Sequence, residues 1–310
     1  MQRLPSLSAT KSRIYSAGLI RKRKNLMIKA IEKFIDKMPS LPATVSRVME
    51  ICDDPATSPA DLNKVVGLDP VLMGKVMQLI NSAYYGRPNK ITSLVRAIIL
   101  LGLNTVKNLA LSTAVLGNLS SDHANDILNM DGFWEHSLCT GVIAKKIAAA
   151  TRIDPKLHEE YFIAGLLHDI GKIPYTNCFP QEYLTAISKS DLNNTPLHKV
   201  ETELFGFDHQ EIGALITKHW KIEGAIRNAV EFHHRSNEYE GENKSLVYAV
   251  AVADYLSLYL ERGFAGNRHP VEPESFVYDA LGISFDQLEA MSDEIKKEID
   301  KARVFLKISQ

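Results

Sequence analysis

Five predicted helices each carry one polar residue on the face that helical spacing assigns to a hydrophobic core: His136, His168, His209, His233 and Asp254. His136, for example, falls in line with Ile143 and Ile147. Side chains three or four residues apart share one face of a helix, so these polar groups point inward. A buried imidazole or carboxylate without a partner is costly. These residues must therefore meet one another, a backbone group or a metal ion.

For any one of them, a hydrogen-bonded core side chain is the simpler interpretation, but its repetition over five helices favours a shared site. Imidazoles and carboxylates that converge from separate helices are how helical proteins build di-metal centres. This donor set suits iron or manganese, with zinc as an alternative, and no cysteine accompanies it as in structural zinc sites. We therefore expect a divalent transition metal as cofactor, with two ions in the site.

Two further residues complete the expected chemistry. Asp169 directly follows His168, and its carboxylate could bridge two cations, which would make bound water acidic enough to ionise near neutral pH. Lys172 lies one helical turn beyond His168 and could steady an anionic phosphoryl oxygen. Asp169 and Lys172 are accordingly the candidate catalytic residues.

The elements that position these groups are all predicted to be helices, so the fold class is all-α. Apolar residues recur at spacings of three and four from residue 25 onward, and no segment alternates long enough for a strand. Five or six helices of 10–15 residues are expected over 25–117. Further helices are expected at about 132–150, 155–171, 180–190, 196–204, 208–219, 222–234, 244–261, 273–281 and 284–306. The polar stretches 173–200 and 235–244 are expected to cover or uncover the site.

The chain divides into four predicted parts: a basic segment over 1–24, a helical lobe over 25–121, the candidate metal-binding lobe over 122–262 and a helical extension over 263–310. The first lobe shows no cluster of titratable groups suited to catalysis. Residues 1–121 hold 17 basic and 7 acidic residues, and the remainder holds 19 and 30. This asymmetry suits either an anionic partner or two lobes that attract each other. No basic stripe is interleaved with aromatic residues, so nucleic-acid binding is not favoured.

Composition excludes several classes of protein. The 310 residues are 45% hydrophobic and 24% charged, which is ordinary for a globular protein and excludes a disordered or fibrous chain. No apolar run approaches the roughly 20 residues of a membrane span, and no signal-peptide core follows the basic N-terminal segment. The three cysteines contain no CxxC pair, which suggests a reducing compartment. We expect a cytoplasmic location.

The segment Ala164–Lys172, which reads AGLLHDIGK, resembles the signature of the HD superfamily of metal-dependent phosphohydrolases. The order of the remaining motifs resembles that family too: FWEH, HQEIG, a His-His doublet and AVAD. The resemblance implies that one metal is held by His136, His168, Asp169 and Asp254. It implies that a second is held by Asp169, His209 and one of the doublet His233–His234, with His233 preferred. His234 remains a candidate ligand, a substrate contact or a solvated neighbour.

Motifs in the first lobe resemble the HDOD domain, a bacterial signalling module related to the HD phosphohydrolases. The resemblance runs over about residues 36–235. Its motifs in the first lobe are Leu41-Pro42, Asp54-Pro55, Asp69-Pro70, Asn81–Gly86, Ile91–Ser93 and Leu101-Gly102. Many HDOD proteins lack the metal ligands, whereas this sequence keeps an apparently full set. It differs from the HD-GYP phosphodiesterases because no Gly-Tyr-Pro follows the doublet and Gly132 stands where a third-metal glutamate would be. Cyclic di-GMP hydrolysis is therefore not expected.

Three functions follow from these patterns. The chain is a signalling protein with a di-metal site that contacts other signalling proteins, with or without turnover. Alternatively it is an active phosphohydrolase on a nucleotide or other phosphoester, or a nucleic-acid-binding regulator that uses the basic first lobe. Among the neighbours of the candidate ligands, Asp208 and Glu211 either orient His209 or cap its helix. The other histidines are assigned to the surface or to helix caps: His158, His198, His219 and His269.

Overall fold

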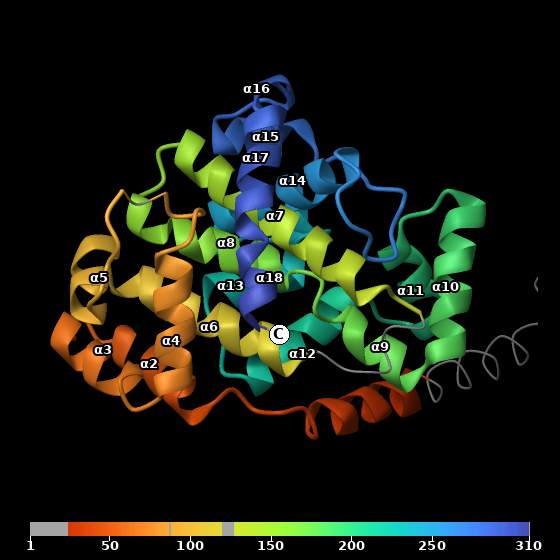
Figure 1. The fold of residues 1–310 in the computed structure, drawn as a ribbon. Helices are drawn as coiled ribbons and strands as arrows, with labels where there is room; N and C mark the ends of the chain where they lie inside the picture. Colours follow the sequence, from red (N-terminus) through yellow and green to blue (C-terminus); the bar gives the residue numbers. More distant parts are fainter. Residues whose placement is uncertain (1–23, 87, 120–126, 310) are drawn as a thin grey trace, which may run out of the picture.

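The computed structural model describes residues 24–86, 88–119 and 127–309 (Figure 1). Within these ranges the chain consists of helices joined by turns and loops, without a β-strand, so the all-α prediction is confirmed. Most of the basic segment 1–24 and the predicted lobe boundary at 121/122 lie outside the described residues. No single described helix is long and apolar enough to cross a membrane. The helices Leu94–Leu101 and Leu103–Asn118 qualify only as a pair, and they are bent by 115°.

Six helices make up the first lobe: residues 24–35, α2 (Ala43–Cys52), α3 (Pro59–Val66), α4 (Pro70–Ile80), α5 (Leu94–Leu101) and α6 (Leu103–Asn118). The predicted number is right, but α3 and α5 are shorter and α6 is longer than expected. Ser58 begins α3 with a reciprocal capping box to Asp61, and Asp69 caps α4. Gly102, at φ 89°, separates α5 from α6 in a conformation that favours glycine.

The second lobe is built around the crossing of α7 (Met130–Ala150) and α8 (His158–Leu167), which follows the short η2 (Pro155–Leu157). The helices approach closely because two glycines meet: a Cβ atom on Gly165 would lie 2.7 Å from the Cα of Gly141. Two further helices, α13 (Ala225–Phe232) and α14 (Lys244–Tyr259), pack on this pair, and α12 (His209–His219) packs on α13. The close crossing allows polar side chains from α7 and α8 to meet inside the lobe.

The predicted helix over 155–171 ends early, at Leu167. A turn follows, because Gly171 packs directly on α12: a Cβ atom there would lie 1.9 Å from the backbone oxygen of His209. Residues 173–200, one of the polar stretches expected to cover or uncover the site, are mostly helical. They form α9 (Lys172–Cys178), α10 (Pro180–Asn193) and the start of α11 (Leu197–Phe205), anchored by the stacked, buried rings of Tyr175 and Tyr183. The stretch 235–244 is a loop that holds only η3 (Ser236–Glu238).

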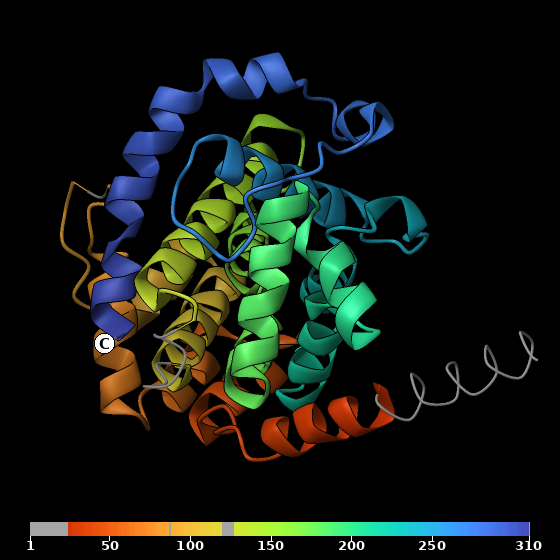
Figure 2. The same cartoon turned by 90° about the vertical axis from the view of Figure 1, so that its right-hand side faces the viewer.

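The predicted helix over 284–306 is three helices, α16 (Phe285–Ala290), α17 (Ser292–Ala302) and α18 (Val304–Ser309), preceded by α15 (Ser275–Leu281). In Figure 2 these blue helices arch along one side of the molecule. α17 packs on α7, and α18 packs on α4 and α6, so the extension contacts both lobes. The loop before α15 is tied to α7, because the Phe264 amide donates to the Gly132 carbonyl at 2.8 Å.

Candidate metal centre

All of the candidate ligands converge in the second lobe. His136 comes from the middle of α7, and His168 and Asp169 follow the last residue of α8. His209 is the first residue of α12, the doublet His233–His234 follows α13, and Asp254 lies on α14. Five of the histidine and aspartate side chains are almost completely buried, and His234 and Asp254 reach the edge of the cluster. The fold therefore gathers residues that are 118 positions apart in sequence.

One group of donors lies around His136 and His168, whose Nε2 atoms are 3.3 Å apart. His136 Nε2 lies 3.2 Å from Asp254 Oδ1 and 3.5 Å from Asp169 Oδ2. His168 Nε2 lies 3.4 Å and 3.3 Å from the same two oxygens. Four donors about 2.1 Å from one ion in a tetrahedron are separated by about 3.4 Å. The observed spacings fit a single metal ion.

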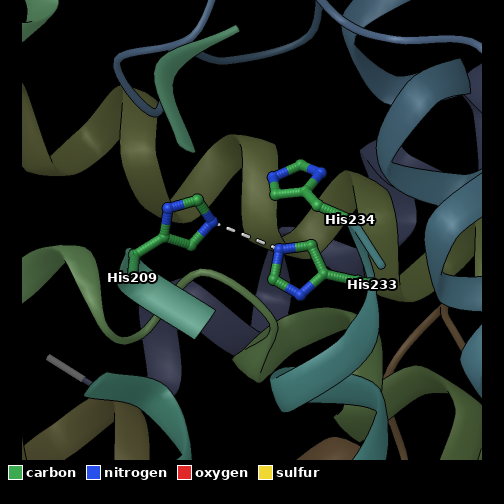
Figure 3. Close-up of side chains that lie close together, drawn as sticks. All are labelled: His209, His233 and His234. Atoms are coloured by element: carbon green, nitrogen blue, oxygen red, sulfur yellow. Dashed lines mark hydrogen bonds between the residues drawn. The ribbon is translucent and has the colours of Figure 1, made fainter. Parts of the chain in front are cut away.

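A second group of donors faces the other oxygen of Asp169. Asp169 Oδ1 lies 3.2 Å from His209 Nε2 and 3.9 Å from His233 Nε2. The two Nε2 atoms are 3.3 Å apart, along the dashed line in Figure 3. The same view shows the His234 ring beside them, and ligand atoms of these three histidines lie within 4.8 Å of one another. Asp169 thus presents one oxygen to each group.

The outward-facing Nδ1 atoms fix the tautomers of His168 and His233. His168 Nδ1 is 2.7 Å from the Gly165 carbonyl, and His233 Nδ1 is 3.0 Å from the Val230 carbonyl. A carbonyl oxygen only accepts, so each Nδ1 carries a hydrogen. A neutral imidazole then has a bare lone pair on Nε2, which is the form that binds a metal. Both lone pairs point into the cluster.

His209 is held by a carboxylate that the sequence analysis missed. Its Nδ1 donates to Glu201 Oε2 at 2.6 Å, and its backbone amide donates to the same oxygen at 2.9 Å. Tyr183 donates its hydroxyl to Glu201 Oε1 at 2.8 Å, so the buried carboxylate is fully engaged. Burial opposes the charge, but His209 outweighs it and lowers the pKa of Glu201. A carboxylate behind a histidine is a common support for a metal ligand.

Asp208 and Glu211, the neighbours that we considered for this role, do not touch the His209 ring. Asp208 instead caps α12 by accepting from the amides of Gln210 and Glu211. The signal that would have found Glu201 is the one that revealed the histidines. It shares an apolar helical face with Leu197, Leu204 and Phe205.

His136 is oriented by a hydroxyl from α14. Ser257 Oγ lies 3.0 Å from His136 Nδ1 and donates its own hydrogen to the Asp254 carbonyl at 2.9 Å. The hydroxyl is therefore free to accept from His136 Nδ1, which leaves the lone pair on Nε2. Ser257 stands one turn after Asp254, so a single helix supplies both the carboxylate and this support.

The cluster favours positive charge. Asp169 Oδ1 is buried without a hydrogen-bond partner among the described residues, although His209 Nε2 is 3.2 Å away. An oxygen and a nitrogen lone pair at that distance repel each other unless a cation or a proton lies between them. Burial opposes a charge on His168 and His209, yet carboxylates outweigh it: Asp169 and Asp254 raise the pKa of His168 to about 10, and Glu201 with Asp169 raises that of His209 to about 9. The donors therefore fit a divalent metal ion.

Lys172 lies inside this cluster rather than at its surface. The residue is 2% exposed, and its ammonium donates to Asp169 Oδ2 at 2.6 Å. Burial opposes the charge on Asp169, but His168 and Lys172 outweigh it and hold the pKa of this carboxyl well below its usual range. The ammonium is thus paired with the candidate bridging carboxylate, and its contact with a phosphoryl oxygen stays a prediction.

A cavity of about 160 Å³ opens onto the cluster. His233, His234 and Asp254 line its inner side, and residues 271–274 of the C-terminal extension form part of its rim. His198 also lines it, with its ring stacked on His234 at a centroid distance of 4.3 Å. Our assignment of His198 to the surface is therefore wrong, because its helix α11 faces the cavity. The extension supplies one wall of the site.

Comparison with known proteins supports this architecture. The family model of the HDOD domain matches residues 38–236. An uncharacterized protein of Treponema pallidum is 27% identical over 228 residues, which are 73% of this chain and 43% of that protein. The chain thus spans less than half the length of this curated relative.

Three solved structures resemble the chain over most of its length. An HDOD domain protein of unknown function from Geobacter sulfurreducens is 26% identical, with a TM-score of 0.67 over 90% of this chain and 97% of that one. A proposed signal transduction protein from Marinobacter aquaeolei has a TM-score of 0.71 at 22% identity, over 94% and 66% of the two chains. A proposed phosphohydrolase from Shewanella amazonensis has a TM-score of 0.66 at 22% identity, over 91% and 98%. At these identities the last two show a common fold.

Proposed function

This chain belongs to the HDOD domain family, and from that premise we propose that it is a signalling protein whose second lobe binds two divalent metal ions and hydrolyses a phosphoester. The observation that carries the proposal is Asp169 Oδ1, a buried carboxylate oxygen without a hydrogen-bond partner in the described chain, which faces the Nε2 atoms of His209 and His233. Such an oxygen is costly to bury unless it contacts a cation.

The donor groups assign the ligands. His136, His168, Asp254 and Asp169 Oδ2 would hold one ion, and Asp169 Oδ1, His209 and His233 would hold the other, with His234 as a further candidate. Mixed imidazole and carboxylate donors favour iron or manganese, with zinc possible. Divalent ions bound there would supply Lewis acidity toward a phosphoryl oxygen and would lower the pKa of water.

The chain's own groups prepare this site. Glu201, Ser257 and two backbone carbonyls hold the four imidazoles as Nδ1–H tautomers, so every Nε2 lone pair faces inward. Burial opposes the charge on Asp169, but His168 and then Lys172 offset it and keep this carboxylate ionised. In this proposal Lys172 acts on the substrate through Asp169.

The cavity limits what can enter. Its volume of about 160 Å³ is below the roughly 300–1,000 Å³ typical of small-molecule sites. We therefore propose that only the phosphoryl group and its ester oxygen enter, and that the rest of the substrate stays at the rim near Lys199 and Asn237. A nucleotide or another phosphoester with an accessible phosphoryl group meets this requirement.

Turnover tests the catalytic part of the proposal. The protein would be reconstituted separately with iron(II), manganese and zinc and assayed with bis(4-nitrophenyl) phosphate and a panel of nucleotides. Asp169→Asn, which keeps the side-chain shape, is expected to abolish hydrolysis, whereas Asp279→Asn, at an exposed position on α15, should leave it unchanged. Metal uptake without hydrolysis of any substrate would overturn the enzymatic assignment and leave a non-catalytic signalling protein.

A further inference from the structure

A second, wider concavity lies between α4 and the C-terminal helices α17 and α18. Its volume is about 1330 Å³, and it shares no lining residue with the cavity over the candidate metal centre. It is a groove between two helical walls, one from the first lobe and one from the extension. The proposed phosphoester chemistry does not use it.

The α4 wall is one continuous helical face. Its lining residues are spaced at three and four along the helix: Pro70, Met73, Gly74, Met77, Gln78 and Asn81. The opposite face of α4 is buried in the lobe. Gly74 stands in the middle of the wall, and no atom lies within 4 Å of the position where its Cβ would be. Half-buried Met73 and Met77 flank this opening with flexible apolar side chains, which suit a partner surface.

The facing wall and the end of the groove are basic. Four cationic residues line the groove, against a single carboxylate at Asp300: Lys90, Lys301, Arg303 and Lys307. Arg303 is paired with Glu135 and Lys301 with Glu298. Lys90 and Lys307 are exposed and form no ion pair with any described residue. Their charges are therefore available to a partner.

The floor of the groove is held by hydrogen bonds and a ring contact. The Asn81 side chain donates to the Met77 and Ile91 carbonyls at 2.9 Å and accepts from the Ile91 amide at 2.7 Å. Just beyond it, the Tyr84 ring packs on Phe305 of α18, with ring centroids 5.3 Å apart. The Tyr84 contact joins the turn after α4 to α18, which also packs on α4 itself. A groove that is already formed spares a ligand part of the cost of ordering its site.

We propose that this groove binds an amphipathic helix of a partner protein, with an apolar stripe on Met73 and Met77 and acidic side chains toward Lys90 and Lys307. An apolar helical face laid into a groove is a recurring mode of recognition, read at i, i+3, i+4 and i+7. The exposed Lys90 and Lys307 favour a partner of opposite charge. The chain's own first 24 residues, with seven basic and no acidic residues, do not match it.

The test uses a displayed pool of helical peptides of about 18 residues, long enough to span about 27 Å. Apolar residues occupy i, i+3, i+4 and i+7, and the other positions are random mixtures of Glu, Lys, Gln and Ser. The pool is first depleted on the bare immobilisation surface and is then selected on the wild-type chain. Gly74→Leu, whose side chain projects into the groove, is kept for the affinity comparison. We expect the selected peptides to be rich in Glu and to bind Gly74→Leu about tenfold more weakly or worse, a loss of about 1.4 kcal/mol. Gly74→Ala should keep the affinity, because one methyl group leaves the groove open.

Charge reversal provides the second arm. The double variant Lys90→Glu/Lys307→Glu should bind the selected peptides about tenfold more weakly at low salt. The control Lys156→Glu/Lys218→Glu, at exposed positions outside the groove, should keep the wild-type affinity. Circular dichroism and metal content confirm that each variant is folded. Failure to enrich any peptide, selection of Lys-rich peptides, or equal affinity for Gly74→Leu would overturn the proposal. So would a wild-type dimer that Gly74→Leu dissociates, because the groove would then belong to a second copy.

Discussion

The support that Glu201 gives to His209 leads to a selective prediction about metal binding. Glu201→Gln can keep an amide oxygen where Oε2 now accepts from the His209 ring and backbone, while Tyr183 can turn its hydroxyl to accept from the new amide. The substitution therefore removes the negative charge and leaves the hydrogen bonds in place. Glu201→Ala removes both. The two variants separate the effect of charge from that of orientation.

The expected loss of metal affinity follows from the position of Glu201 behind the candidate ligand His209. Loss of a partner behind a metal ligand costs about 10–100-fold in metal affinity. We expect about tenfold for Glu201→Gln and about a hundredfold for Glu201→Ala, which correspond to about 1.4 and 2.7 kcal/mol. Only the ion held by His209 should be affected, because Glu201 contacts no donor of the His136–His168 group in the described structure.

Competition titration with a chromophoric chelator measures the two binding steps separately. The step that belongs to the site containing His209 should shift in the Glu201 variants, while the other step stays within about twofold of the wild type. Glu203→Gln provides the matched control, since Glu203 lies on the same helix but is exposed. An equal loss in both steps, or no loss in either, would refute the reasoning that His209 is a ligand oriented by Glu201.

Three further predictions concern stability. Gly171→Ala places a methyl group against the His209 carbonyl and should lower the free energy of unfolding by about 2 kcal/mol or more in urea titrations; a value within about 0.5 kcal/mol of the wild type would contradict the packing of this turn on α12. Phe305→Ala should cost about 3–5 kcal/mol, because this ring is 1% exposed and packs on Tyr84 and Phe162; a loss below about 1 kcal/mol would mean that the extension is not part of the core. Removal of the metal with EDTA should lower the melting temperature of metal-loaded protein, because metal at about 100 times its Kd stabilises the native state by about 2.7 kcal/mol. An unchanged melting temperature would exclude metal binding that stabilises the fold.

Sequence periodicity predicted the helices and the convergence of polar residues because both depend on local spacing. A polar side chain at a core position of a helix must find a buried partner, so four helices with a histidine and one with Asp254 there indicated one cluster. The same rule would have included Glu201, which shares its face with Leu197, Leu204 and Phe205. The sequence neighbours of His209, Asp208 and Glu211, do not point to Glu201, which lies eight residues before it on another helix.

Other features depend on packing between segments that are distant in sequence. The turn after His168 forms where Gly171 meets α12, and no local breaker marks the end of α8 at Leu167. The breaks at Met291 and Arg303 likewise lack glycine and proline and follow from the course of the extension over both lobes. His198 reaches the cavity only because α11 lies beside the histidine doublet.

The central claim is that Asp169 joins two metal ions, and elemental analysis of protein purified without chelators tests it most directly. We predict about two equivalents of iron, manganese or zinc per chain in the wild type and in Asp279→Asn, and a loss of both ions in Asp169→Asn, because each of its oxygens faces one donor group. Circular dichroism of the same samples controls for folding. Metal-free wild-type protein, even after anaerobic reconstitution with each metal, would contradict the account.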